Sequence, residues 1–144
     1  TIIDAMSTIQ SQSTSNPCSI SQKAAVAALR LGNPFTKTMV TEFDRRRRVM
    51  VDRLNKMPGV TCRMPTGAFY AFPNVSGLLG KRWKDQPIGS AANLATYLLN
   101  EAQVAVVPGE PFGSDIHIRL SYATAMEAIE RGLTRIDAAL RRLS

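Results

Sequence analysis

The fold class is decided by residues 116–140, which read IHIRLSYATAMEAIERGLTRIDAAL. The first seven alternate strictly, so a strand here would have one apolar face and a second face carrying His117, Arg119 and Ser121. Thr124 and Glu127 then have the spacing of a capping box, and apolar residues recur after them at steps of three and four up to Leu140. A half-buried strand followed at once by an amphipathic helix predicts a domain that mixes strands with helices.

The rest of the chain supplies further helices and short strands. A Ser-x-x-Gln box at residues 19–22 and Gly32 mark the ends of a helix over about 20–31, and Asn33-Pro34 starts a long amphipathic helix that runs to about Met57. We also expect helices over 1–12 and 90–103, the second capped by Ser90, and a surface loop over 74–89. Short strands are expected over residues 60–63, 68–72, 104–107 and 116–122. The expected product is an α/β sandwich in which a sheet of about four short strands is covered by helices.

The length and composition are those of an ordinary folded domain. The chain has 144 residues, of which 44% are hydrophobic and 20% charged, and this mix excludes wholesale disorder. Cys18 and Cys62 lie far apart without metal-ligand spacing, which favours a reducing compartment over a disulfide framework or a metal site. There is no membrane-length apolar run and no leader-like start, so we expect a soluble, cytoplasmic protein with no membrane partner. The first residue is not Met, which fits a fragment or a processed chain.

The formal net charge of +7 leaves a basic binding module open as an alternative, with nucleic acid as its partner. The densest cluster of positive charge is the run of four arginines at residues 45–48. Successive residues of a helix point about 100° apart, so this run cannot form one basic stripe. We therefore interpret it as a solvated or ion-paired helix surface and expect no nucleic-acid partner.

Catalytic motifs are scarce when the residues are considered alone. The sequence has one histidine, no phosphate loop, no Ser-His-Asp order and no metal cluster. His117 has no neighbour in sequence that would orient it, so we interpret it as structural. No self-sufficient active site is visible.

Four segments, in order, carry a resemblance to a known family. They are QSQSTSNP at residues 10–17 with QKAA at 22–25, PTGAFYAFP at 65–73, VAVVPGEPFG at 104–113 and IRLSYA at 118–123. Together they cover nearly the whole chain and resemble the aspartate aminotransferase family, of fold type I among pyridoxal-phosphate enzymes. The resemblance implies that residues 1–32 end the large, cofactor-binding domain. Residues 33–144 would form the small carboxy-terminal domain, with the helix over 34–57 as a bridge.

The resemblance also implies an activity for the parent enzyme. That activity is transfer of the amino group of an α-amino acid, most simply aspartate, to a 2-oxo acid, 2-oxoglutarate, in a homodimer that uses pyridoxal phosphate. An aromatic or other amino-acid aminotransferase is the alternative. In the family the cofactor lysine lies upstream of the segment that matches residues 10–17, and no lysine of this chain has that context. We therefore expect no catalytic and no cofactor-binding residue here, and an inactive chain when it is alone.

One substrate-binding residue is carried over from the family with its motif. Arg119 matches the arginine of the family's Ile-Arg-x-Ser-Tyr-Ala strand, which clamps the substrate α-carboxylate, whereas alternation alone would leave it a surface arginine. Ser15 and Asn16 match a segment near the active site of the neighbouring subunit. Ser11 stands where the animal-type subgroup has an arginine for a second carboxylate, which points to the bacterial-type subgroup or to another side-chain preference. Tyr70 and Phe72, in the second motif, are expected in the core.

Overall fold

The computed structural model describes residues 1–14 and 16–144 and divides into two compact units, Thr1–Val40 and Thr41–Ser144. Each unit is described by itself. The boundary between them lies within a helix, whereas the domain boundary expected at residues 32/33 stays a prediction. No helix among the described residues is long and apolar enough to cross a membrane.

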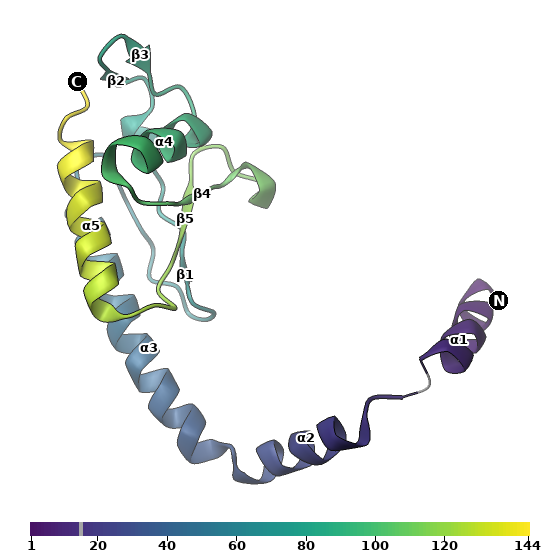
Figure 1. Cartoon of the computed structure of the whole chain (residues 1–144). Helices are drawn as coiled ribbons and strands as arrows, with labels where there is room; N and C mark the ends of the chain where they lie inside the picture. The colour runs from purple at the N-terminus through teal and green to yellow at the C-terminus, as the bar shows by residue number, and fades with distance from the viewer. Residues whose placement is uncertain (15) are drawn as a thin grey trace. The chain divides into compact units, whose positions relative to one another are not determined.

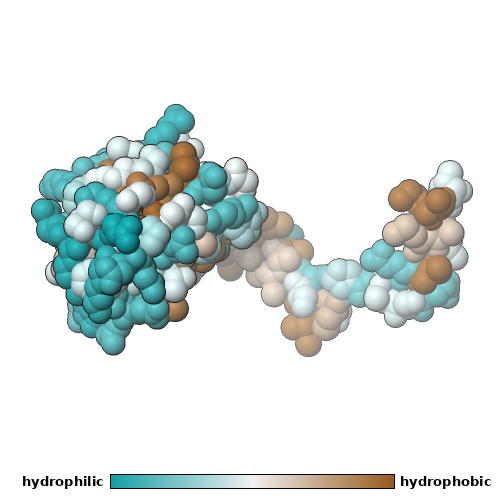
Figure 2. Space-filling view, turned by 90° about the horizontal axis from the view of Figure 1, so that it is seen from above, coloured by the Kyte–Doolittle hydropathy of each residue, from teal (hydrophilic) through white to brown (hydrophobic). Residues whose placement is uncertain are grey.

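The first unit consists of helices whose apolar side chains face solvent. They are α1 (Ile2–Ser13), α2 (Ser19–Leu31) and the start of α3 (Asn33–Leu54). Thr1 and Asp4 form a capping box at the start of α1. Figure 2 shows brown, hydrophobic residues gathered on this part of the chain. The large apolar side chains that are more than 60% exposed are Ile2, Ile3, Ile9, Ile20, Leu29, Leu31 and Phe35.

The expected cap of α2 is wrong in its details. Cys18 is the N-cap residue and forms no side-chain cap bond. Gln22 Nε2 instead donates a hydrogen bond of 2.8 Å to the carbonyl oxygen of Pro17. The helix itself is confirmed, because it covers residues 19–31.

The second unit contains an antiparallel sheet of three short strands in the order β1-β5-β4. These are β1 (Tyr70–Ala71), β5 (Ile118–Ser121) and β4 (Val107–Pro108). The central strand β5 pairs Ser121 with Tyr70 on one side and Arg119 with Val107 on the other. The alternation expected for this strand is confirmed, since Ile118 and Leu120 are buried.

Helices cover the apolar face of this sheet. They are the end of α3, α4 (Ala91–Tyr97), which continues as a π-helical turn over Leu98–Ala102, and α5 (Met126–Leu140). Ser90 caps α4 by accepting a hydrogen bond from the backbone of Asn93, as expected. Figure 1 shows α5 alongside the end of α3, and Arg53 of α3 donates hydrogen bonds to Glu130 and Thr134 of α5. The buried core includes Leu54, Leu94, Leu98, Ile118, Leu133 and Ile136.

Several expected elements differ in the structure, although the α/β character is confirmed. The expected strand over 60–63 is reduced to one bridge between Thr61 and Asn74, so the sheet has three strands instead of about four. The expected loop over 74–89 contains a 3₁₀ turn at Ser76–Leu78 and a separate hairpin of β2 (Arg82–Trp83) and β3 (Gln86–Pro87). Helix α5 starts after Ala125, and Thr124 forms no cap there.

Candidate functional site

Arg119 lies at the centre of the site that the sequence singled out. It occupies the middle strand of the sheet, and the backbone of β5 is paired on both sides. Its side chain is half-buried on the face opposite Ile118 and Leu120. A strand fixed in this way gives the guanidinium a rigid base.

Two aromatic rings contact the Arg119 guanidinium. Its Cζ lies 4.4 Å from the ring centroid of Tyr70 and 4.4 Å from that of Phe112. Among the described residues, the Arg119 side chain forms no hydrogen bond and no ion pair, so the N–H groups of its guanidinium have no protein acceptor. Guanidinium N–H groups form a planar fork that matches a carboxylate, and this fork is available here.

The expectation that Tyr70 and Phe72 belong to the core is wrong. Only Ala71, between them, points into the core and is fully buried. Because side chains alternate along a strand, both rings lie on the same face as Arg119. The Phe72 ring, 36% exposed, stacks on His117 at 4.8 Å and meets the Phe112 ring edge-on at 6.2 Å.

His117 is held at this face by two contacts, although the sequence had offered no neighbour to orient it. Its Nδ1 lies 2.6 Å from the hydroxyl oxygen of Ser114, and its ring is stacked on Phe72. Sequence reasoning missed Ser114, which lies three residues before His117. The alternation over residues 116–122 placed His117 on the same face as Arg119. It gave no signal for Ser114, which lies before that stretch.

The loop that carries Phe112 folds back closely onto β5. A Cβ atom at Gly109 would lie 2.4 Å from the carbonyl oxygen of Ser114 and 2.6 Å from that of His117, so only glycine fits there. A 3₁₀ turn follows over Glu110–Phe112 and ends at Gly113 with φ +82. The loop over residues 109–113 is therefore a tight connection.

A concavity of about 640 Å³ opens on the same face of the sheet. It shares Tyr70, Phe72 and His117 with the surroundings of Arg119. Cys62 also lines it, but this thiol is buried, and burial raises its pKa. The concavity therefore has polar and aromatic walls and no reactive thiolate; Arg119 is not itself among its lining residues.

The arginine run at residues 45–48 is an ion-paired helix surface, as expected. Arg45 and Arg46 bind Glu42 at 2.9 and 2.7 Å, and their side-chain hydrogen bonds lower the pKa of Glu42 to about 2. Arg48 and Arg47 pair with Asp44, and Arg47 also donates to the carbonyl oxygen of Pro65. Two carboxylates within one turn of the helix therefore neutralise part of the charge of this run.

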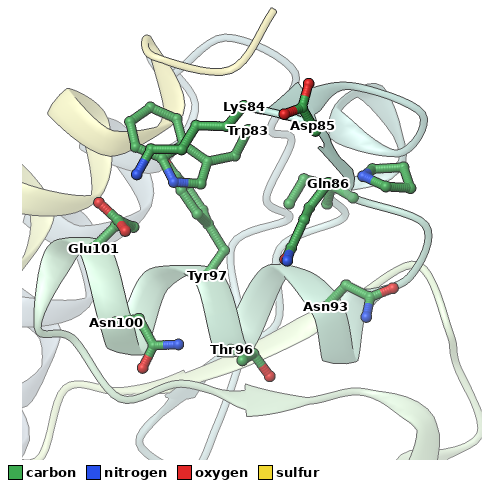
Figure 3. Close-up of a pocket in the computed structure, with 11 residues that line it drawn as sticks. Trp83, Lys84, Asp85, Gln86, Asn93, Thr96, Tyr97, Asn100 and Glu101 are labelled. Carbon is green, nitrogen blue, oxygen red and sulfur yellow. The ribbon is translucent and has the colours of Figure 1, made fainter.

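A second concavity, of about 440 Å³, lies between the β2–β3 hairpin and α4 (Figure 3). Its cation Lys84 lies over the ring of Trp83 at 5.2 Å, and the nearby Arg142 contacts both this ring and Glu101. Polar side chains also line it: the amides of Asn93 and Asn100 and the hydroxyl of Thr96, from α4 and the turn that follows. Glu101, which lines this pocket, pairs with Arg142, whereas Arg119 has no acidic partner among the described residues.

Ser15 and Asn16 are the residues expected near the active site of a neighbouring subunit. Asn16 is exposed in the first unit, where its Nδ2 lies 3.4 Å from the carbonyl oxygen of Pro17. Ser15 lies outside the described residues. Their role remains a prediction.

Comparison with known proteins gives consistent matches. The family model described as Aminotransferase class I and II matches residues 1–136. The aspartate aminotransferase of Rhizobium meliloti strain 1021 is 46% identical over 144 residues, covering 99% of this chain and 35% of the relative. The aspartate/prephenate aminotransferase of Cereibacter sphaeroides is 48% identical over 138 residues, covering 95% and 34%. The crystal structure of the aspartate aminotransferase from Rhizobium meliloti matches with a TM-score of 0.92 at 45% identity, covering 99% of this chain and 36% of that chain.

Proposed function

This chain belongs to the class I and II aminotransferases, and we propose that it is part of an enzyme that transfers the amino group of aspartate to 2-oxoglutarate. The chain spans about 35% of the length of the curated relatives it matches, so the activity is proposed for a longer, complete protein. The observation that carries the proposal is Arg119, a guanidinium on a rigid strand with its N–H fork free. An α-carboxylate is common to both substrates, and the fork can bind it through two parallel hydrogen bonds.

Pyridoxal phosphate is the cofactor we propose for the complete enzyme, but the lysines of this chain do not fit it. Lys23, Lys37, Lys56 and Lys84 are exposed. Lys81 lies 3.4 Å from the carbonyl oxygen of Leu143. No lysine lines the concavity beside Arg119. We therefore assign the cofactor's attachment to a part of the protein outside this chain.

The segments before and after residue 32 would have different roles in the complete enzyme. We propose that residues 1–32 form the end of the cofactor-binding domain and that the helix over 34–57 connects this domain to the small domain. The remaining residues would form the small domain, which moves to exclude water when substrate binds. Ser15 and Asn16 would lie near the site of the neighbouring subunit in a homodimer. A cytoplasmic location fits the two free cysteines.

Association is the expected behaviour of this chain in isolation. The exposed apolar side chains of α1 and α2 form surfaces that seldom remain bare in water. We expect dimers or larger species in sedimentation velocity runs, and charged replacements of Ile3 and Ile9 should favour the monomer. A chain that stays monomeric at high concentration, with its first 32 residues protected from proteolysis, would contradict this expectation.

The substrate assignment is tested with the complete protein and a panel of amino donors. With 2-oxoglutarate as acceptor, aspartate should have a higher kcat/KM than phenylalanine or tyrosine. An aromatic donor preferred over aspartate would replace the assignment with the aromatic aminotransferase alternative. Prephenate belongs in the panel as an acceptor, because a relative's name includes it.

A further inference from the structure

The Arg119 guanidinium contacts two aromatic rings, whereas many arginines in proteins pair with acidic side chains. The two ring centroids lie 4.4 Å from its Cζ, well inside the range of about 6 Å over which a cation and a ring attract each other. The rings come from segments far apart in the sequence, Tyr70 from β1 and Phe112 from the 3₁₀ turn after β4. Their convergence on one side chain is a product of the tertiary fold.

Both rings are themselves fixed in place. Tyr70 pairs through its backbone with Ser121, two residues along the strand from Arg119. The turn that carries Phe112 is closed by a 3.1 Å hydrogen bond from the Ser114 amide to the Gly109 carbonyl oxygen. Ser114 is in turn bonded to His117 on β5 at 2.6 Å, and the Phe72 ring meets Phe112 edge-on.

The nature of these contacts matters for carboxylate binding. An acidic partner would orient Arg119 equally well, but it would occupy the N–H groups that an incoming carboxylate needs. A ring attracts the positive charge through its π face and accepts no hydrogen bond in the plane of the fork. The two rings can therefore orient the guanidinium while leaving its donors unpaired.

We propose that Tyr70 and Phe112 are positioning residues that hold Arg119 by cation–π contacts and keep its N–H fork free for the substrate α-carboxylate. The proposal rests on the proposed function, since it assumes that Arg119 binds this carboxylate. It adds two residues, and the loop over 108–114, to the determinants of substrate affinity.

The test uses Tyr70→Leu and Phe112→Leu in the complete enzyme, next to the ring-retaining variants Tyr70→Phe and Phe112→Tyr. Loss of a ring should raise KM for aspartate and for a neutral donor alike by roughly 2- to 30-fold, the fold-change that corresponds to one cation–π contact. The ring-retaining variants should keep a KM close to that of the wild type, which a role for the tyrosine hydroxyl would not allow. Phe112 is 48% exposed, so its replacement leaves the core intact and can decide the question if Tyr70→Leu does not fold.

Trp83→Leu is the matched control. It removes a ring from the same kind of contact, 4.9 Å from Cζ of Arg142, in a pocket without an assigned role. Its KM should stay unchanged. A normal KM in both ring-loss variants, together with a large defect in Arg119→Ala, would reject the positioning role and leave the proposed function intact. A normal Arg119→Ala enzyme would reject the carboxylate-binding role of Arg119 on which the positioning role depends, whereas only a wild-type enzyme that fails to transaminate aspartate would reject the proposed function itself.

Discussion

Arg119→Ala in the complete enzyme is expected to lower kcat/KM by roughly two to four decades, because removing one partner of a desolvated charge pair costs about 3–5 kcal/mol. The substrate carboxylate would lose both hydrogen bonds from the fork, and its charge would remain without a partner in the closed site. Steady-state kinetics with aspartate and 2-oxoglutarate measure the loss.

Two controls separate this loss from a folding defect. The Arg119→Ala enzyme should stay folded because the side chain is only half-buried, although it loses two cation–π contacts worth about 0.5–2 kcal/mol each. Arg131→Ala removes another arginine of the same unit, one whose ion pair with Glu127 is exposed, and should keep the wild-type kcat/KM. Wild-type activity in Arg119→Ala would mean that this arginine is only a surface residue.

The second large effect is the absence of activity in this chain by itself. Without a lysine placed to bind pyridoxal phosphate, we expect no transamination above the rate of free cofactor and no covalently held cofactor. Incubation with pyridoxal phosphate, borohydride reduction and mass spectrometry would detect any specific attachment.

The outcome that would contradict this expectation is also specific. One lysine modified in high yield, with an absorbance band that survives gel filtration and replacement of the exposed lysines, would show that the chain holds its own cofactor site. Scattered, low-yield modification of exposed lysines is the expected background. The wild-type complete protein provides the positive control.

The sequence predicted those parts of the fold that depend on local periodicity. The alternation around Arg119 placed it on the face opposite Ile118, and the apolar stripes located α2, α3 and α5. A long helix contains many apolar positions, so its periodic pattern can be recognised even when single residues depart from it. The motifs added what periodicity could not, namely the family and the role proposed for Arg119.

The short elements were beyond this reasoning. Strands β2 and β3 have two residues each, which is too few for a periodic pattern to appear. Lys84, at the turn between them, has a φ of 55, and lysine has no preference for this backbone conformation. The strand expected over 60–63 pairs only at Thr61. Tertiary pairing determines such elements.

The rings around Arg119 were missed for a related reason. The sequence Tyr70-Ala71-Phe72 was interpreted as core because aromatic residues are usually buried, whereas the small Ala71 faces the core. Alternation allowed either face to be the inner one. The contact with Phe112 depends on how the loop after β4 folds back, which requires the structure.

The most direct test of the central claim is the kcat/KM of Arg119→Lys for aspartate and for a neutral amino acid such as alanine, each relative to the wild type. Lysine keeps the charge but loses the paired donors, and the α-carboxylate is the same in both donors. We predict that kcat/KM falls by a similar factor for the two. A fall for aspartate alone would show that Arg119 binds the side-chain carboxylate, and no fall for either would show that it does not bind substrate.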